Sequence, residues 1–152
     1  MLVTSIGREE VPAGEMMARF NHGYAQGPTE GPDQLIGGYG DDDLKGLGGD
    51  DTIVASAGND RLDGGPGTDL LRGGEGRDTF VFHAGEGGYD RVDDFQVGVD
   101  RLEVHAASGY PVWAMEAGDG AGGYGTWVVY NWNNEAVFLA GVTGAGVDAL
   151  LA

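Results

Sequence analysis

A short phrase recurs from Gly31 to Leu102: a glycine, any residue, an aspartate, any residue and then an apolar residue. Six copies follow one another at nine-residue spacing, and two more come after an interruption. The copies are Gly31/Asp33/Leu35, Gly40/Asp42/Leu44, Gly49/Asp51/Ile53, Gly58/Asp60/Leu62, Gly67/Asp69/Leu71, Gly76/Asp78/Phe80, Gly88/Asp90/Val92 and Gly98/Asp100/Leu102. A nine-residue period is too short for a helical repeat and fits one strand plus one tight turn, so it predicts a β-solenoid. The aspartates of such a winding stack at its turns.

The apolar residue of each copy is expected to point into the winding. Because successive strands lie on alternate sides, these residues form two facing rows: Leu35, Leu44, Ile53, Leu62, Leu71 and Phe80. One apolar residue in nine makes a thin core, whereas ordering the backbone of every residue costs conformational entropy. We therefore expect the winding to need a further source of stability.

Stacked carboxylates dominate the charge of the chain. Its 25 acidic and 8 basic residues give a net charge of -17, and rows of aspartates repel one another unless cations lie between them. Carboxylates and glycine carbonyls form an all-oxygen, flexible donor set that suits Ca2+ better than Mg2+. The chain has no cysteine, and its three histidines (His22, His83 and His105) are scattered along the sequence, which argues against zinc or copper.

Several segments resemble the RTX, or hemolysin-type, nonapeptide GGxGxDxUx, a calcium-binding β-helix signature. The closest copies are GGYGDDDLK (37–45), GGPGTDLLR (64–72) and GGEGRDTFV (73–81). GLGGDDTIV (46–54) and ASAGNDRLD (55–63) lose early glycines but keep the fourth glycine, the aspartate and the apolar residue, and TEGPDQL (29–35) opens the series in degenerate form. Six copies in register are far more specific than one acidic glycine-rich segment, which could be a flexible linker.

The resemblance implies a parallel β-roll in which each nonapeptide is half a coil and Ca2+ lies between successive turns on the same side. It implies about four to six ions for this chain. The implied ligands of one site are Gly38, Gly40 and Asp42 with Ala55, Ala57, Asn59 and Asp60. A second site pairs Gly49 and Asp51 with Gly64, Pro66, Thr68 and Asp69, a third pairs Gly58 and Asp60 with Gly73, Glu75, Arg77 and Asp78, and an earlier one pairs Gly31 and Asp33 with Gly46, Gly48, Asp50 and Asp51. Gly67, Gly76 and Asp90 complete the implied set.

Two departures from the repeat are expected to affect particular sites. Pro32 and the missing glycines at positions 28 and 29 weaken the first site. The residues inserted around Phe82–Ala84 are expected to break the register of any site that joins Asp69 or Asp78 to Asp90.

The last third of the chain predicts an antiparallel β-sheet that caps the roll. Residues 78–104 resemble the segment of serralysin-type proteases that follows their roll and leads into antiparallel strands. Residues 110–115, 126–131 and 136–140 are β-rich. Asn133 and Asn134 predict a turn between the last two strands. A cap protects the open sheet edge from aggregation. The predicted fold is therefore all-β: an N-terminal arm or cap (1–27), a parallel β-roll (28–103) and an antiparallel β cap (104–152).

The two ends of the chain carry weaker signals. Pro12 could open a short helix through Phe20 that covers the first coil, or this arm could dock a partner. The apolar stretch before Arg8 is too short for a secretory signal, and no segment reaches membrane-spanning length. The tail GVTGAGVDALLA is similar to the uncleaved export signal of secreted RTX proteins, although it could also be a last strand. The resemblance implies type I secretion to the outside of the cell.

No enzymatic motif is evident. The H-E-x-x-H signature that serralysin-type chains carry is absent, as is a G-x-S-x-G elbow. Paired carboxylates are better explained as calcium ligands than as glycosidase residues. We therefore expect no catalysis, and the negative charge argues against nucleic acid.

The sequence predicts a secreted calcium-binding protein that folds on binding Ca2+ and serves as a binding or structural module. Two alternatives stay open. The layout is similar to the R-modules of secreted alginate epimerases, which implies calcium-dependent polysaccharide binding. The chain could instead be a structural component of an extracellular assembly. The C-terminal aromatic residues could fill a core or stack on sugars: Tyr110, Trp113, Tyr124, Trp127, Tyr130 and Trp132.

Overall fold

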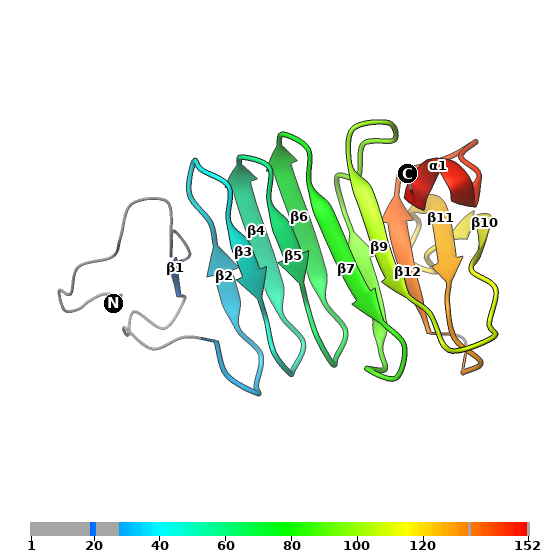
Figure 1. Ribbon diagram of the computed structural model, residues 1–152, viewed down its shortest axis with the longest axis horizontal. Coiled ribbons are helices and arrows are strands. Elements are labelled where there is room, and N and C mark those ends of the chain that lie inside the picture. The colour runs from blue at the N-terminus through cyan, green and yellow to red at the C-terminus, as the bar shows by residue number, and fades with distance from the viewer. Residues whose placement is uncertain (1–18, 21–27, 134, 152) are drawn as a thin grey trace, which may run out of the picture.

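The computed structural model describes residues 19–20, 28–133 and 135–151, and this part of the chain is built mainly of β-strands (Figure 1). Two short strands come first, β1 (Arg19–Phe20) and β2 (Gln34–Ile36). The repeats and their continuation form β3 (Asp43–Lys45), β4 (Thr52–Ala57), β5 (Arg61–Asp63), β6 (Leu70–Glu75), β7 (Thr79–His83), β8 (Tyr89–Val92) and β9 (Arg101–His105). The remaining elements are β10 (Trp113–Gly118), β11 (Tyr124–Val129), β12 (Ala136–Ala140) and the helix α1 (Val147–Leu151). The predicted all-β fold, a parallel roll followed by antiparallel strands, is confirmed.

The chain alternates between two parallel sheets as it winds. Strands β2, β4, β6 and β8 are neighbours in one sheet, and β3, β5, β7 and β9 are neighbours in the other. Each strand pairs with the strand one full coil later, so Leu35 lies beside Ile53 and Leu44 beside Leu62. The coils therefore stack along the long axis of the molecule (Figure 1).

The space between the two sheets is filled by the apolar residue of each repeat. The six predicted core residues are at most 3% exposed, which confirms their inward orientation: Leu35, Leu44, Ile53, Leu62, Leu71 and Phe80. Val92 and Leu102 continue the two rows beyond the interruption. In each strand of the repeats, the residues directly before and after the apolar residue point away from the core, because successive side chains of a β-strand face opposite sides of the sheet.

The C-terminal strands extend one sheet of the roll. Strands β10, β11 and β12 pair antiparallel, and β12 pairs parallel with β8, so the roll and the cap share one sheet. This arrangement covers the edge of β8 that the roll would otherwise leave open. The tail does not form the last strand that we considered, because Val147–Leu151 is helical and buries Leu150.

The predicted N-terminal helix is wrong at its end. Arg19–Phe20 forms β1, which pairs antiparallel with β2. The rest of the proposed helix and arm lies outside the described residues. Within the described part of the chain, no helix has the length and apolar character needed to span a membrane.

Candidate metal centre

The aspartates of the repeated glycine-aspartate-apolar phrase form two ladders along the edges of the roll. Their shared geometry is a hydrogen bond from the backbone N–H of one aspartate to the side-chain Oδ1 of the aspartate one coil later, with N···O distances of 2.7–3.0 Å. One ladder contains Asp33, Asp51, Asp69 and Asp90, and the other contains Asp42, Asp60, Asp78 and Asp100. All eight residues are at most 8% exposed. The nine-residue period thus places a column of buried carboxylates on each side.

The second oxygen of these carboxylates shows whether a cation fits. Within the described structure, Oδ2 of Asp51, Asp60, Asp69 and Asp78 is buried and has no hydrogen-bond partner. A buried carboxylate oxygen without a partner is costly. A divalent cation would satisfy these oxygens and neutralise the column, so the residues present fit Ca2+.

Glycine is required where the turns approach these oxygens. A Cβ at Gly64 would collide with Oδ2 of Asp69, and a Cβ at Gly73 would collide with Oδ2 of Asp78. Gly67 has a φ of 143° and lies against the carbonyl oxygen of Gly49 in the preceding turn. The glycines thus allow both the left-handed backbone and the close stacking of turns.

Burial makes the charged form of the ladder carboxylates unfavourable in the metal-free chain. Desolvation raises the pKa of Asp51 and Asp78 to about 6, of Asp69 to about 7 and of Asp90 to about 8, and neighbouring carboxylates add to each shift. A bound cation would have the opposite effect because it stabilises the ionised form.

The structure brings each predicted pair of turns together. The turns of Gly38–Asp42 and Ala55–Asp60 are neighbours, as are those of Gly31–Asp33 and Gly46–Asp51. The same holds for Gly49–Asp51 with Gly64–Asp69 and for Gly58–Asp60 with Gly73–Asp78. Some predicted carbonyl ligands already accept one hydrogen bond: Pro66 O from Gly49 N at 3.0 Å and Glu75 O from Gly58 N at 2.9 Å. A carbonyl has a second lone pair, so their role as ligands stays a prediction.

The ladder aspartates near the two ends of the roll differ from those in its middle, because Oδ2 of Asp42 accepts from Gly38 N and Oδ2 of Asp100 from Gln96 N, each at 2.8 Å. The degenerate first turn makes a similar contact. The backbone N–H and the hydroxyl of Thr29 both donate to Oδ2 of Asp33, at 2.6 and 2.9 Å. Thr29 therefore supplies to Asp33 Oδ2 partners of the kind that Oδ2 of Asp51, Asp60, Asp69 and Asp78 lacks.

The expected break in register around Phe82–Ala84 is wrong for the aspartate ladder. The longer connection between β7 and β8 absorbs the inserted residues, and Asp69 N still donates to Asp90 Oδ1 at 2.9 Å. Gly88 adopts a φ of 85° and packs on the carbonyl of Gly67, as Gly67 packs on that of Gly49. Asp78 does not face Asp90; its ladder partner is Asp100.

Sequence reasoning missed Asp100, and it did not predict the side-chain hydrogen bonds that the predicted ligands Asp50 and Asn59 make between turns. Asp100 extends the second ladder although it was not among the predicted ligands, and the glycine-aspartate-leucine phrase that contains it was the available signal. Exposed side chains also connect turns beside each aspartate ladder. Asp41 Oδ1 accepts from Asn59 N and Asn59 Oδ1 from Arg77 N beside one ladder, and Asp50 Oδ1 accepts from Thr68 N beside the other. The side chains of Asp41, Asp50 and Asn59 are exposed, unlike the buried carboxylates of the ladders.

Comparison with known families identifies the repeats. A model of the RTX calcium-binding nonapeptide repeat (4 copies) matches residues 29–53 and 45–80. Residues 29–80 are RTX calcium-binding repeats. Among solved structures, the solution structure of the AlgE6R3 subunit from the Azotobacter vinelandii mannuronan C5-epimerase is similar, with 29% sequence identity and a TM-score of 0.61. The match covers 82% of each chain. No curated protein sequence matches.

Beyond the RTX repeats, the outer face of the cap carries a groove lined by aromatic and apolar side chains. Tyr89, Trp113 and Met115 line it and are 55%, 43% and 45% exposed, and Trp127 also lines it. Tyr89 and Trp127 meet edge to face, with ring centroids 6.2 Å apart. Of the predicted aromatic set, Tyr130 is buried in the core, whereas Tyr124 and Trp132 are exposed.

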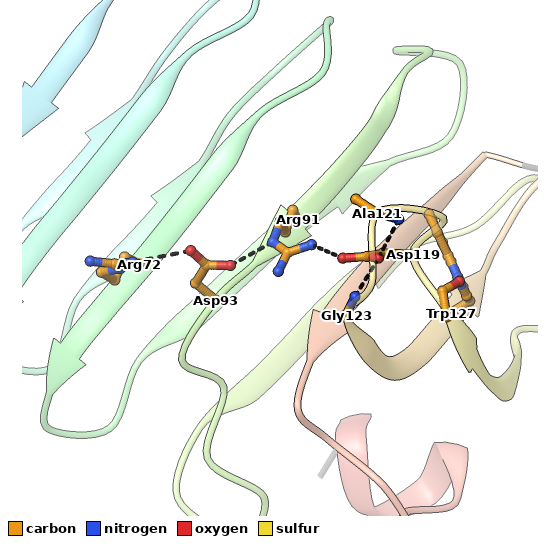
Figure 2. Close-up of polar contacts among 8 residues, drawn as sticks. Arg72, Arg91, Asp93, Asp119, Ala121, Gly123 and Trp127 are labelled. Carbon is orange, nitrogen blue, oxygen red and sulfur yellow. Dashed lines mark hydrogen bonds and ion pairs between the residues drawn. The ribbon is translucent and has the colours of Figure 1, made fainter.

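Arg91, which lines a neighbouring pocket together with Tyr89 and Trp127, is already paired with carboxylates. Figure 2 shows Arg91 of the RTX roll between Asp93 and Asp119, with N···O distances of 2.6 and 2.7 Å. Arg72 also pairs with Asp93, at 3.1 Å. Asp119, in the turn between β10 and β11, in turn accepts hydrogen bonds from the backbone of that turn. This chain of ion pairs joins the roll to the cap.

Proposed function

We propose that this protein is a secreted RTX module that folds on binding several Ca2+ ions outside the cell and then acts as a binding or structural module. The observation that carries the proposal is the row of buried aspartate oxygens without partners, at Asp51, Asp60, Asp69 and Asp78. The RTX repeats and the similarity to the epimerase subunit support a non-catalytic calcium-binding module.

Calcium is proposed to control folding because the buried carboxylates of the ladders destabilise the folded state when no metal is bound. Six hydrogen-bonded steps, three in each ladder, join the aspartates of neighbouring turns. Each step brings two buried carboxylates together, and we assign about four to six ions to these steps. Extracellular modules bind Ca2+ with a Kd of about 10^-4 to 10^-3 M. Such sites would be empty at cytosolic Ca2+ concentrations and filled outside the cell.

Far-UV circular dichroism with Ca2+ and after addition of EGTA tests this proposal. We expect the β signal in Ca2+ to disappear in EGTA, and Mg2+ at the same concentration should not restore it, because Mg2+ requires tight octahedral geometry. Calorimetric titration should count about four to six ions per chain. A β signal that persists unchanged in EGTA would reject calcium-dependent folding.

A second candidate function is calcium-dependent binding of an alginate-like polysaccharide. The exposed groove of Tyr89, Trp113 and Trp127 favours it, because large exposed apolar patches commonly mark binding surfaces. Arg72 and Arg91 already pair with carboxylates. We therefore expect the aromatic side chains of the groove, rather than these guanidinium groups, to make the main contact with the face of a sugar ring.

Affinity gels that contain alginate or a neutral polysaccharide test this candidate with and without Ca2+. We expect retardation only with Ca2+, and Trp113→Ala should weaken it. Trp132→Ala is the matched control, because Trp132 is 67% exposed but lies outside the groove, in the connection between β11 and β12. If migration is the same in every gel, polysaccharide binding is excluded.

A further inference from the structure

A second kind of donor cluster lies on the outer side of the roll, where β5 and β7 end. Asp63 is the last residue of β5, His83 is the last residue of β7, and Glu86 follows in the next connection. One donor atom from each side chain lies within 4.8 Å of the other two. The distance between His83 Nε2 and Asp63 Oδ2 is 3.6 Å. His83 lies twenty positions after Asp63 in the sequence, so the spacing along the chain does not indicate this cluster.

The cluster is short of partners in the part of the molecule that the structure describes. Oδ1 of Asp63 is buried and accepts no hydrogen bond. No described lysine or arginine forms an ion pair with Asp63 or Glu86, and the neighbouring Arg61 pairs with Glu103 at 2.8 Å instead. Burial raises the pKa of Glu86, and Asp63 adds to that rise. Two carboxylates and a neutral imidazole carry a charge of about -2, which one divalent cation would balance.

The donor types select the class of cation. Imidazole nitrogen suits Zn2+ and related transition ions, whereas Ca2+ prefers oxygen ligands alone. In a tetrahedral zinc site with bonds of about 2.0–2.1 Å, neighbouring donor atoms lie about 3.3 Å apart. The 3.6 Å separation of His83 Nε2 and Asp63 Oδ2 is close to that value.

Neighbouring groups hold the donors in place. The backbone N–H of His83 donates to Oε2 of Glu86 at 3.2 Å, which keeps Glu86 close to the imidazole. The ring of His105 stacks on that of His83, with centroids 4.6 Å apart and an interplanar angle of 9°. His105 itself interacts with Glu103 through Nε2, at 3.1 Å, so it orients His83 without being one of the three donors.

We propose that Asp63, His83 and Glu86 form a binding site for Zn2+, separate from the calcium ladders, with water in the fourth position. The site goes beyond the proposed calcium function and does not depend on which partner the protein binds. It requires only the folded roll.

Calorimetric titration of the full chain with Zn2+, at saturating Ca2+, tests the site. We expect one equivalent to bind, and Co2+ bound in its place should show the visible absorption of a four-coordinate ion. Changes to groups outside the ligand shell cost metal sites about 10- to 100-fold in affinity, so loss of a ligand in His83→Gln should weaken Zn2+ binding at least about tenfold. Asp63→Asn should also weaken it. Circular dichroism in Ca2+ checks that each variant folds.

His105→Gln is the matched control, because it removes a neighbouring imidazole and leaves all three donors. Its loss of affinity should be clearly smaller than that of His83→Gln. Equal Zn2+ binding by the wild type and His83→Gln would overturn the proposal, as would an equal loss in both histidine variants. A lower Ca2+ stoichiometry in His83→Gln would also overturn it, by making the cluster part of a calcium site.

Discussion

At the scale of single residues, each repeat position has a distinct physical role. The aspartate supplies one oxygen to the backbone of the preceding coil and leaves the other, at Asp51, Asp60, Asp69 and Asp78, buried and without a partner. The apolar residue two positions later fills the core. A neighbouring acidic residue such as Asp50 is exposed and connects adjacent turns from outside.

Asp69→Asn and Asp50→Asn separate the two kinds of carboxylate. In Asp69→Asn, the side chain can still accept from Asp51 N but loses its charge in the middle of a ladder. We expect it to lower the Ca2+ stoichiometry by at least one and to raise the Ca2+ concentration needed for folding. Asp50→Asn keeps the acceptor for Thr68 N and should bind Ca2+ as the wild type does. Calorimetry and circular dichroism measure both effects, and identical behaviour of the two variants would contradict the assignment.

The raised pKa values predict how pH acts on the protein without calcium. The folded-state pKa is about 7 for Asp69 and about 8 for Asp90, well above the ordinary value of 3.8. Between pH 4 and 8 the folded state therefore binds more protons than the unfolded state, so its stability rises as the pH falls through this window. In buffer freed of calcium by a chelating resin, we expect more β signal at pH 5 than at pH 8. A weaker signal at pH 5 would contradict this prediction.

At the scale of elements, the junction between roll and cap depends on pairings far apart in sequence. Strand β12 pairs parallel with β8, and Arg91 of β8 reaches Asp119 in the turn between β10 and β11 (Figure 2). The Arg91 guanidinium holds the pKa of Asp119 at about 2 and also lies 5.2 Å from the ring centre of Phe138. One side chain therefore contacts the turn and the strand that together cover the end of the roll.

Arg91→Ala should destabilise this junction. It removes the cation between Asp93 and Asp119, so the two carboxylates lose a shared partner. In saturating Ca2+ we expect a Tm lower by a few degrees. The control is Arg101→Ala, since Arg101 is exposed and forms no ion pair with any described residue. Thermal melts followed by circular dichroism compare the variants, and equal Tm values would show that the ion pairs contribute nothing measurable.

At the scale of the whole molecule, a thin core and a net charge of -17 are combined in one continuous structure. The larger sheet runs from β1 through the even-numbered strands of the roll to β12, β11 and β10 (Figure 1). Because the cap continues this sheet, no break in the sheet separates the cap from the calcium-dependent roll. Folding of the roll and of the cap should therefore be coupled.

The three tryptophans report on this coupling because all of them, Trp113, Trp127 and Trp132, lie in the cap. In a Ca2+ titration, the midpoint of the tryptophan fluorescence change should coincide with that of the far-UV circular dichroism change. Coincident transitions are expected for one cooperative unit. Two clearly separated midpoints would show that the cap folds independently of the calcium ladders.

The sequence alone predicted the features that repeat. The parallel winding, the inward rows and the stacking of aspartates in successive turns follow from a local period of nine residues, because every coil makes the same contacts with the next. The predicted cap strands matched β11 and β12 closely, whereas β10 begins at Trp113 rather than at Tyr110. The calcium ligands implied by the RTX resemblance lie in neighbouring turns, although ion binding at each remains a prediction.

Only the tertiary structure decided the contacts that leave this period. The Asp69–Asp90 step spans 21 residues across an insertion, β12 returns to pair with β8, and Asp63 meets His83 and Glu86. The phrase Gly88/Asp90/Val92 marks Asp90, but neither the register of its contact with Asp69 nor the other two contacts follow from a local pattern, because each depends on how a connection of particular length packs against the coil. A repeat specifies its own neighbours through identical local geometry, whereas the position of non-repeating residues is determined by the packing of the whole chain.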